Sequence, residues 1–252
     1  ICSGGKCHGK WVFTCRIAAR HLRAVTAWCF NPIMTSDTPS DLIREARASI
    51  LSEIGGEVTL VAASKRQPDE RIDAALAAGQ RVFGENRVQE AQARWAERRS
   101  AYADLELRLI GPLQTNKAED AVQLFDVIET LDRQKLLKAL IKAIDKTGAS
   151  PPDLLIQVNT GEEPQKGGVL PADLAGLVAM SRELYPGKIA GLMCIPPAAE
   201  PAGPHFALLK KLADHHDFGQ VSMGMSGDYP LAARLGATHV RVGTAFFGAR
   251  ET

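Results

Sequence analysis

The sequence predicts a single (β/α)8 TIM barrel, and three observations lead to this α/β fold class. Its 252 residues match the roughly 250 residues of such barrels. Short runs of β-branched and apolar residues alternate with longer segments whose apolar residues recur at helical spacing. Eight strand–helix units follow one another, and strict alternation of this kind implies parallel strands. We expect the barrel to occupy residues 34–252.

The first half of the chain is expected to supply four strands and their helices. A helix is expected over residues 41–54, where apolar residues recur at helical spacing. Pro68 sits in the first turn of the next helix, Asp132 caps a later one, and Gly148 ends that one. Strands are expected over residues 57–63, 81–83, 105–110 and 125–128, and helices over 68–78, 86–99 and 133–147, with a short helix after Thr115.

The second half continues the alternation. Strands are expected over residues 154–158, 188–192, 220–222 and 239–242, and helices over 171–184, 204–215 and 230–235. An open doubly wound sheet is the alternative fold. That fold would place a glycine-rich nucleotide loop after the first strand, but the sequence there is Ala62-Ala63-Ser64-Lys65. The barrel is therefore the favoured fold.

Composition excludes several classes of protein. Hydrophobic residues make up 45% and charged residues 23%, as in ordinary soluble proteins rather than disordered chains. No apolar run approaches the ~18 to 20 residues that span a bilayer. The net charge of +1 gives no reason to expect a nucleic-acid partner. No cysteine or histidine pattern predicts a metal site.

Residues 1–33 differ from the rest of the chain. They hold five basic residues, no acidic residue and four of the five cysteines. From Met34 onward there are 25 basic and 29 acidic residues and one cysteine, as in a protein of the reducing cytoplasm. A transit peptide is one interpretation of the first segment. We favour the other, that residues 1–33 are upstream or non-native sequence.

The candidate site lies at the carboxyl ends of the strands, where active sites of these barrels lie. Lys65 follows the first strand and Asn86 the second, while Arg241 lies at the end of the eighth, beside the first once the barrel closes. Desolvation there would favour the neutral amine of Lys65, which forms Schiff bases. Ser226-Gly227 and Gly243-Thr244 follow the seventh and eighth strands, where such barrels commonly bind phosphate.

Residues 57–250 also resemble the YggS/PROSC family of pyridoxal phosphate homeostasis proteins. The resemblance rests on six blocks: Ala63-Ser64-Lys65, Phe83-Gly84-Glu85-Asn86, Ile110-Gly111-x-Leu113-Gln114-x-Asn116-Lys117, Gly191-Leu192-Met193, Ser222-Met223-Gly224-Met225-Ser226, and Arg241-Val242-Gly243-Thr244-Ala245-x-Phe247-Gly248. It implies a barrel like that of alanine racemase, of the fold type III found among pyridoxal 5′-phosphate (PLP) enzymes, without the racemase β-domain. It also implies PLP as cofactor.

The resemblance gives each site residue a role. Lys65 is implied to carry PLP as an internal aldimine, and Arg241 to face the pyridine nitrogen. Ser226, Gly243 and Thr244 are implied to hold the phosphate, and Asn86 lies in a matching block beside them. Two positions depart from the family's usual residues. Leu107 and Arg108 replace Trp-His before the third block, which leaves the packing there in question, and Arg66 replaces Thr after the lysine.

Two functions follow from this resemblance. The first is a PLP carrier that supplies or buffers the cofactor, without turnover of its own, for apo PLP-dependent enzymes. The alternative is a racemase-like PLP enzyme, and a Schiff-base aldolase is a weaker third class. We favour the carrier because no second domain is expected to offer an opposing base, and because a cation at the pyridine nitrogen weakens the ring as an electron sink. A cytoplasmic monomer is expected. Lys166, on a loop at the rim, is either an aid to PLP entry or merely exposed.

Overall fold

A computed structural model describes residues 38–249. Eight parallel strands form a closed barrel in the order β1 to β8, and β8 pairs with β1. The strands are β1 Thr59–Ala63, β2 Val82–Glu85, β3 Glu106–Leu109, β4 Val127–Leu131, β5 Asp153–Val158, β6 Ile189–Cys194, β7 Gln220–Ser222 and β8 His239–Val242. The predicted (β/α)8 barrel is confirmed. The expectation for residues 1–33 lies outside the described residues.

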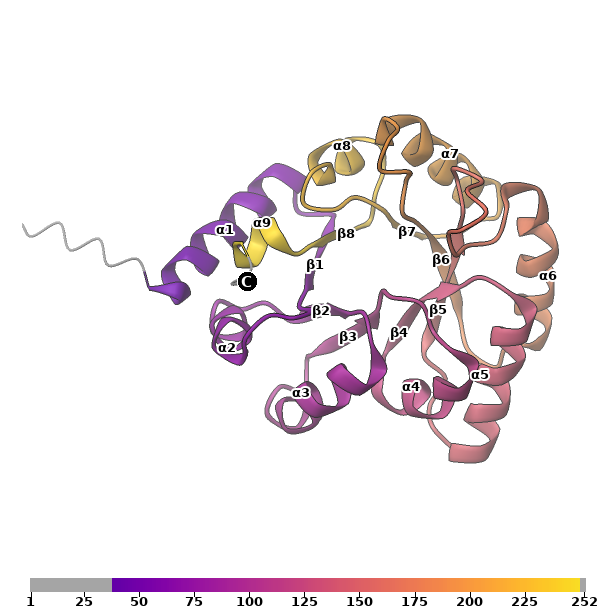
Figure 1. Ribbon diagram of the computed structural model, residues 1–252, viewed down its shortest axis with the longest axis horizontal. Coiled ribbons are helices and arrows are strands. Elements are labelled where there is room, and N and C mark those ends of the chain that lie inside the picture. Colours follow the sequence, from indigo (N-terminus) through magenta and orange to yellow (C-terminus); the bar gives the residue numbers. More distant parts are fainter. Residues whose placement is uncertain (1–37, 250–252) are drawn as a thin grey trace, which may run out of the picture. The chain divides into compact units, whose positions relative to one another are not determined.

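The helices surround the strands (Figure 1). They are α1 Pro39–Ile54, α2 Asp69–Ala77, α3 Val88–Ala101, α4 Ala118–Leu124, α5 Gln134–Thr147, α6 Leu174–Leu184, α7 Ala202–His215, α8 Tyr229–Arg234 and α9 Thr244–Phe247, with short 3-10 turns at Thr115–Lys117 and Pro171–Asp173. Helix α1 contacts α2, α8 and α9, so the first helix packs against the last ones. None of the described helices is both long and apolar enough to cross a bilayer.

Local sequence signals account for several helix ends. Thr38 caps α1, because its hydroxyl accepts a hydrogen bond from the Asp41 backbone nitrogen at 3.3 Å. Gly148 ends α5 in the left-handed conformation, with φ of 68°, as predicted. The predicted cap of α5 by Asp132 is wrong. Arg133 is the capping residue without a side-chain hydrogen bond, and Asp132 instead accepts one from the Arg133 guanidinium.

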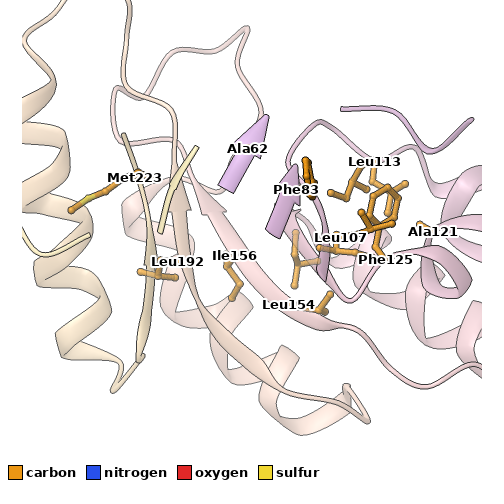
Figure 2. Packing of buried hydrophobic residues seen from close by; sticks show 14 of the residues in the cluster. Ala62, Phe83, Leu107, Leu113, Ala121, Phe125, Leu154, Ile156, Leu192 and Met223 are labelled. Atoms are coloured by element: carbon orange, nitrogen blue, oxygen red, sulfur yellow. The ribbon is translucent and has the colours of Figure 1, made fainter. Parts of the chain in front are cut away.

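The main hydrophobic core lies between the barrel and its helices. Phe83 and Leu107, from β2 and β3, pack with Phe125, Leu113 and Ala121 (Figure 2). All five are buried. Burying each of the phenylalanine and leucine side chains stabilises the fold by roughly 1.5–3 kcal/mol. The period-2 alternation of each strand sends the alternate residues Val82, Gly84, Glu106 and Arg108 into the barrel.

The inner face of the barrel is partly polar. Arg108 and Arg241 occupy inward positions on β3 and β8, and Glu129 does so on β4. The fourth strand was predicted to end at Ile128 but continues to Leu131. The prediction stopped there because Glu129 and Thr130 are polar. Both are buried in the structure, where other residues hydrogen-bond them.

Close backbone approach explains one inner glycine. Gly191 of β6 lies beside β7, and a Cβ atom there would stand 1.9 Å from the carbonyl oxygen of Gln220. No side chain fits in that gap. Gly191 therefore allows β6 and β7 to pair at the seam next to Ser222 and Arg241.

Candidate ligand pocket

The structure brings all six predicted binding residues to one pocket. It has a volume of about 300 Å³ and lies at the carboxyl ends of the strands. The six are Lys65, Asn86, Ser226, Arg241, Gly243 and Thr244. The other lining residues are Ala63, Gln67, Ile110, Ile195, Met225 and Gly227. This lining, all of it among the described residues, contains two cations and no carboxylate, so it suits an anionic ligand.

Lys65 lies half-buried in the loop that follows β1. Within residues 38–249 its ammonium has no hydrogen-bond or ion-pair partner. The next residue, Arg66, adopts φ of 56°, a conformation unusual for a side chain other than glycine. The loop therefore has a fixed, uncommon shape, and the amine it presents is available to a ligand.

A guanidinium from α3 holds this loop in place. Arg94 donates to the carbonyl oxygens of Ser64 and Gln67, each at 3.0 Å, so it bridges the residues on both sides of Lys65. It also pairs with Glu85 at 2.9 Å. The Arg94 side chain is 15% exposed, which makes these bonds stronger than those of a surface arginine.

Glu85 anchors the same cluster from β2. The fully buried carboxylate accepts hydrogen bonds from the Ser64 hydroxyl at 2.8 Å and from the Trp95 indole nitrogen at 3.0 Å, besides the Arg94 pair. Its neighbour Asn86 lines the pocket. Glu85 thus joins the loop of Lys65 to the second strand and to α3.

The loops after β7 and β8 meet at Ser226. Its hydroxyl oxygen accepts hydrogen bonds from the backbone nitrogens of Gly243 at 3.3 Å and Ala245 at 3.2 Å. Thr244 lies between them at the start of α9, a four-residue helix that the sequence did not predict. The predicted phosphate-binding residues therefore form one cluster of backbone N–H groups and hydroxyls.

Arg241 lies at the inner wall of the pocket, and its side chain is 3% exposed. It donates to the Ser222 hydroxyl at 2.6 Å and to the Cys194 carbonyl oxygen at 2.8 Å. These two acceptors, from β7 and β6, fix the plane of the guanidinium. Burial raises the pKa of the Cys194 thiol to about 12, so this neighbour stays protonated.

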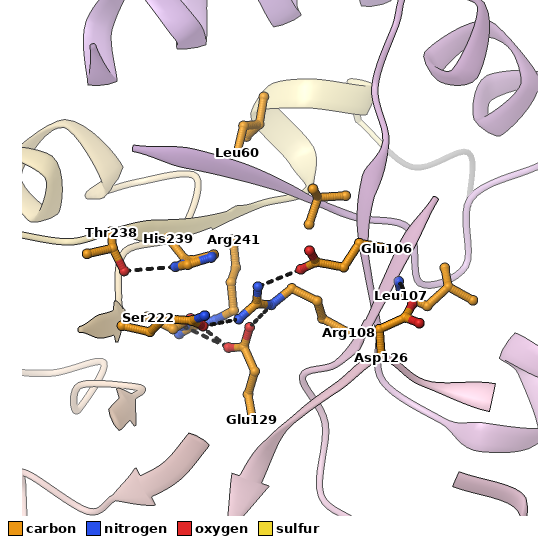
Figure 3. A network of polar contacts seen from close by, with 12 residues as sticks. Leu60, Glu106, Leu107, Arg108, Asp126, Glu129, Ser222, Thr238, His239 and Arg241 are labelled. Atoms are coloured by element: carbon orange, nitrogen blue, oxygen red, sulfur yellow. Dashed lines mark hydrogen bonds and ion pairs between the residues drawn. The ribbon is translucent and has the colours of Figure 1, made fainter. Parts of the chain in front are cut away.

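The structure shows how Arg108, which departs from the family's usual residue, is accommodated inside the barrel. Its guanidinium reaches three acceptors: Glu129 Oε1 at 2.6 Å, Glu106 Oε1 at 2.6 Å and Gln220 Oε1 at 3.0 Å. Glu129 Oε2 in turn accepts from the Ser222 hydroxyl at 2.6 Å. Figure 3 shows the resulting chain of contacts from Arg108 to Arg241.

Glu129 is a carboxylate in this buried network. Burial alone would raise its pKa, but the charges of Arg108 and Arg241 and the Ser222 hydrogen bond outweigh burial and lower the pKa below its ordinary value. For Arg108, burial opposes the charged form, yet Glu129 and Glu106 raise its pKa. The network therefore carries fixed charges at neutral pH.

Sequence reasoning missed the residues behind the pocket. Arg94 and Glu85 support Lys65, and Glu129 supports Arg241 through Ser222, but none of them was given such a role. The sequence feature that could have revealed Glu129 is its place directly after the apolar residues of the fourth strand. Lys166 does not line the pocket; its ammonium pairs with Glu163 at 2.6 Å. No group of three metal-ligating side chains occurs within the described part of the chain.

The chain is similar to known proteins along most of its length. The family model described as "Alanine racemase, N-terminal domain" matches residues 52–251. A pyridoxal phosphate homeostasis protein of Pseudomonas aeruginosa is 40% identical over 216 residues, covering 83% of this chain and 91% of the relative. The Escherichia coli K12 protein of that name is 39% identical over 208 residues, covering 77% and 87%.

Solved structures agree with this similarity. PipY of Synechococcus elongatus, solved with PLP bound, is 41% identical with a TM-score of 0.75, and covers 82% of this chain and 100% of PipY. An alanine racemase from Corynebacterium glutamicum is 17% identical with a TM-score of 0.64, covering 84% of this chain and 62% of the racemase. The second likeness concerns the fold alone.

Proposed function

The chain belongs to the family of pyridoxal phosphate homeostasis proteins, and from this premise we propose that it binds PLP in the pocket of Lys65 and Arg241 and acts in PLP homeostasis. The observation that carries the proposal is the pocket lining: within residues 38–249 it combines a lysine without a polar partner and a buried arginine with a cluster of N–H and hydroxyl donors, and it contains no carboxylate. A volume of about 300 Å³ lies at the lower end of the roughly 300–1,000 Å³ of small-ligand pockets.

The donor set fits PLP group by group. Bound PLP supplies an aldehyde that condenses with primary amines and a ring that accepts electrons. We assign the aldehyde carbon to Lys65 and the ring nitrogen to Arg241. Ser226, Gly243 and Thr244 are assigned to the phosphate, because backbone N–H groups and hydroxyls suit its oxygens. Asn86 also lines the pocket.

We propose a carrier rather than an enzyme, and the pocket's chemistry supports this. Racemisation needs proton transfer on two faces of the substrate. Among the described residues that line the pocket, Lys65 is the only one with an ordinary proton-transfer base. Arg241 is a fixed cation, which disfavours protonation of the ring nitrogen. Both features argue against the racemase-like alternative.

The proposal extends to partners and location. A carrier would hand PLP to apo PLP-dependent enzymes, and the opening of the Lys65 pocket at the strand ends would allow an incoming amine to reach it. We further propose a cytoplasmic monomer. The nearly cysteine-free composition after Met34 supports a reducing compartment.

Three measurements on one preparation test the proposal. Protein loaded with PLP and freed of excess should absorb in the visible range, and it should reactivate an apo-aminotransferase even when a phosphatase destroys free PLP. It should also exchange the α-deuterium of labelled alanine no more than about tenfold faster than free PLP does. Failure to retain PLP would refute the function, whereas exchange many orders of magnitude faster would make the protein a racemase-like enzyme.

A further inference from the structure

The inner wall of the barrel holds two buried charged residues besides Arg241. Arg108 and Glu129 are both buried, with side chains 1% and 0% exposed. A buried ion pair is weak evidence for stability, because desolvation offsets the attraction. These two residues do not line the pocket. Their connection to Arg241 gives them a role.

The two oxygens of Glu129 are divided between two partners. Oε1 accepts from Arg108 Nε at 2.6 Å, and Oε2 accepts from the Ser222 hydroxyl at 2.6 Å. Arg241 Nη1 is 3.8 Å from Oε2 and instead donates to Ser222 Oγ at 2.6 Å. The Ser222 hydroxyl has a single proton, which it donates to Glu129. Its lone pairs therefore accept the hydrogen bond from Arg241. The order of donation is thereby fixed.

We propose that Arg108, Glu129 and Ser222 are positioning residues for Arg241, and that together they set how the pocket recognises the ring nitrogen of its ligand. The inference rests on the proposed function. Glu129 holds Arg241 through the hydroxyl of Ser222. Arg108 holds the other carboxylate oxygen and so fixes the orientation of Glu129, with Oε2 toward Ser222 and 3.8 Å from Arg241 Nη1.

Further hydrogen bonds hold the two guanidinium groups in place. Glu106 and Gln220 hold Arg108 on its far side at 2.6 and 3.0 Å. The Cys194 carbonyl oxygen accepts a hydrogen bond from Arg241 Nη2 at 2.8 Å. Each guanidinium is therefore held from at least two strands, and Glu129 is the carboxylate between them (Figure 3).

The test compares the affinities of PLP and of its 1-deaza analogue, in which a CH group replaces the ring nitrogen. The ratio of the two dissociation constants isolates the contact with Arg241. Ser222→Ala and Arg108→Met should each lower the preference for PLP by roughly tenfold, the effect of one hydrogen bond to a charged group. Arg108→Lys should restore most of it. Ser181→Ala is the matched control, since this serine is also buried but lies on α6 with no hydrogen bond from its hydroxyl among the described residues.

The outcomes separate this inference from the proposed function. Wild-type protein that retains no PLP refutes the function itself. Wild-type protein that binds PLP while folded Ser222→Ala and Arg108→Met variants keep the wild-type ratio within twofold overturns only the positioning role. A lower melting temperature with an unchanged ratio would likewise show that the network is merely structural.

Discussion

The hydroxyl oxygen of Ser226 accepts a hydrogen bond from the backbone nitrogen of Gly243 at 3.3 Å, which joins the loop after β7 to the loop after β8. The two residues are 17 positions apart. The backbone nitrogen of Ala245 donates to the same oxygen. The two N–H groups thus converge on the Ser226 oxygen and hold the two loops together beside the pocket.

Gly243→Val should weaken the binding of PLP far more than that of phosphate-free pyridoxal. A Cβ atom at position 243 would meet the Ala63 carbonyl oxygen at 3.4 Å and Ala63 Cβ at 3.6 Å, which are ordinary contacts. The fold should therefore survive, while the two added methyl groups crowd the N–H donors. We expect a loss of at least roughly tenfold for PLP. Gly243→Ala is the milder control, and equal losses for both ligands, measured by titration, would contradict the phosphate assignment.

Lys65→Ala should abolish covalent attachment of PLP. Lys65 is the lysine of the pocket lining, and its amine has no partner among residues 38–249. Wild-type protein treated with borohydride should carry a pyridoxyl group on the peptide containing Lys65, as located by mass spectrometry. Lys166→Ala serves as a control because Lys166 lies outside the pocket. Visible absorbance of unchanged intensity in the Lys65→Ala protein would exclude the assignment.

Arg94→Met should destabilise both the fold and the Lys65 loop. It removes the donors to Ser64 and Gln67 and leaves the buried Glu85 without its cation. Breaking such a pair costs about 3–5 kcal/mol of unfolding free energy, which urea denaturation would measure. PLP affinity should fall as well, because the loop loses its fixed shape.

Arg98→Met on the same helix is the comparison for Arg94. Its ion-pair partners Asp69 and Asp73 are 64% and 60% exposed. Exposed pairs contribute about 0–1 kcal/mol. A loss of stability as large as that of Arg94→Met would mean that the Glu85 cluster has no special role.

The sequence predicted the parts of the fold that depend on local patterns. The bounds of β7 and β8 agree with the prediction, because β-branched valines (Val221, Val240 and Val242) stand there between glycine-containing turns. Residues of the pocket were predictable because barrel topology brings strand ends together. The four-residue helix α9 has no periodicity of its own and was missed.

The polar interior could not be predicted in this way. A charged residue in a strand is normally expected to face solvent, and Arg108 and Glu129 are 21 positions apart on neighbouring strands. Whether such a pair can be buried depends on the third and fourth partners, here Glu106 and Ser222. Glu106 lies on β3 with Arg108, but Ser222 comes from β7, much later in the chain. Tertiary contacts therefore decide the course of β4 beyond Ile128.

His239 should make the protein lose stability in mild acid. It lies on β8 near Arg241 and shares a contact of 2.8 Å with the Thr238 hydroxyl (Figure 3). Burial, and then the charge of Arg108, lower the pKa of His239 from 6.5 to about 4. Between these two values the unfolded chain binds a proton that the folded protein does not.

The unfolding free energy should therefore fall as the pH drops from 6.5 to 4 and should be insensitive to His239 above that range. One pKa unit corresponds to about 1.36 kcal/mol, so the full loss from this histidine is about 3 kcal/mol. Urea denaturation at several pH values between 4.5 and 8 measures it. His239→Gln should flatten the curve, whereas His215→Gln, at the exposed end of α7, should leave it unchanged. If His239→Gln kept the wild-type slope between pH 4.5 and 6.5, the acid sensitivity would arise elsewhere and the neutral state of the partly buried imidazole would be refuted.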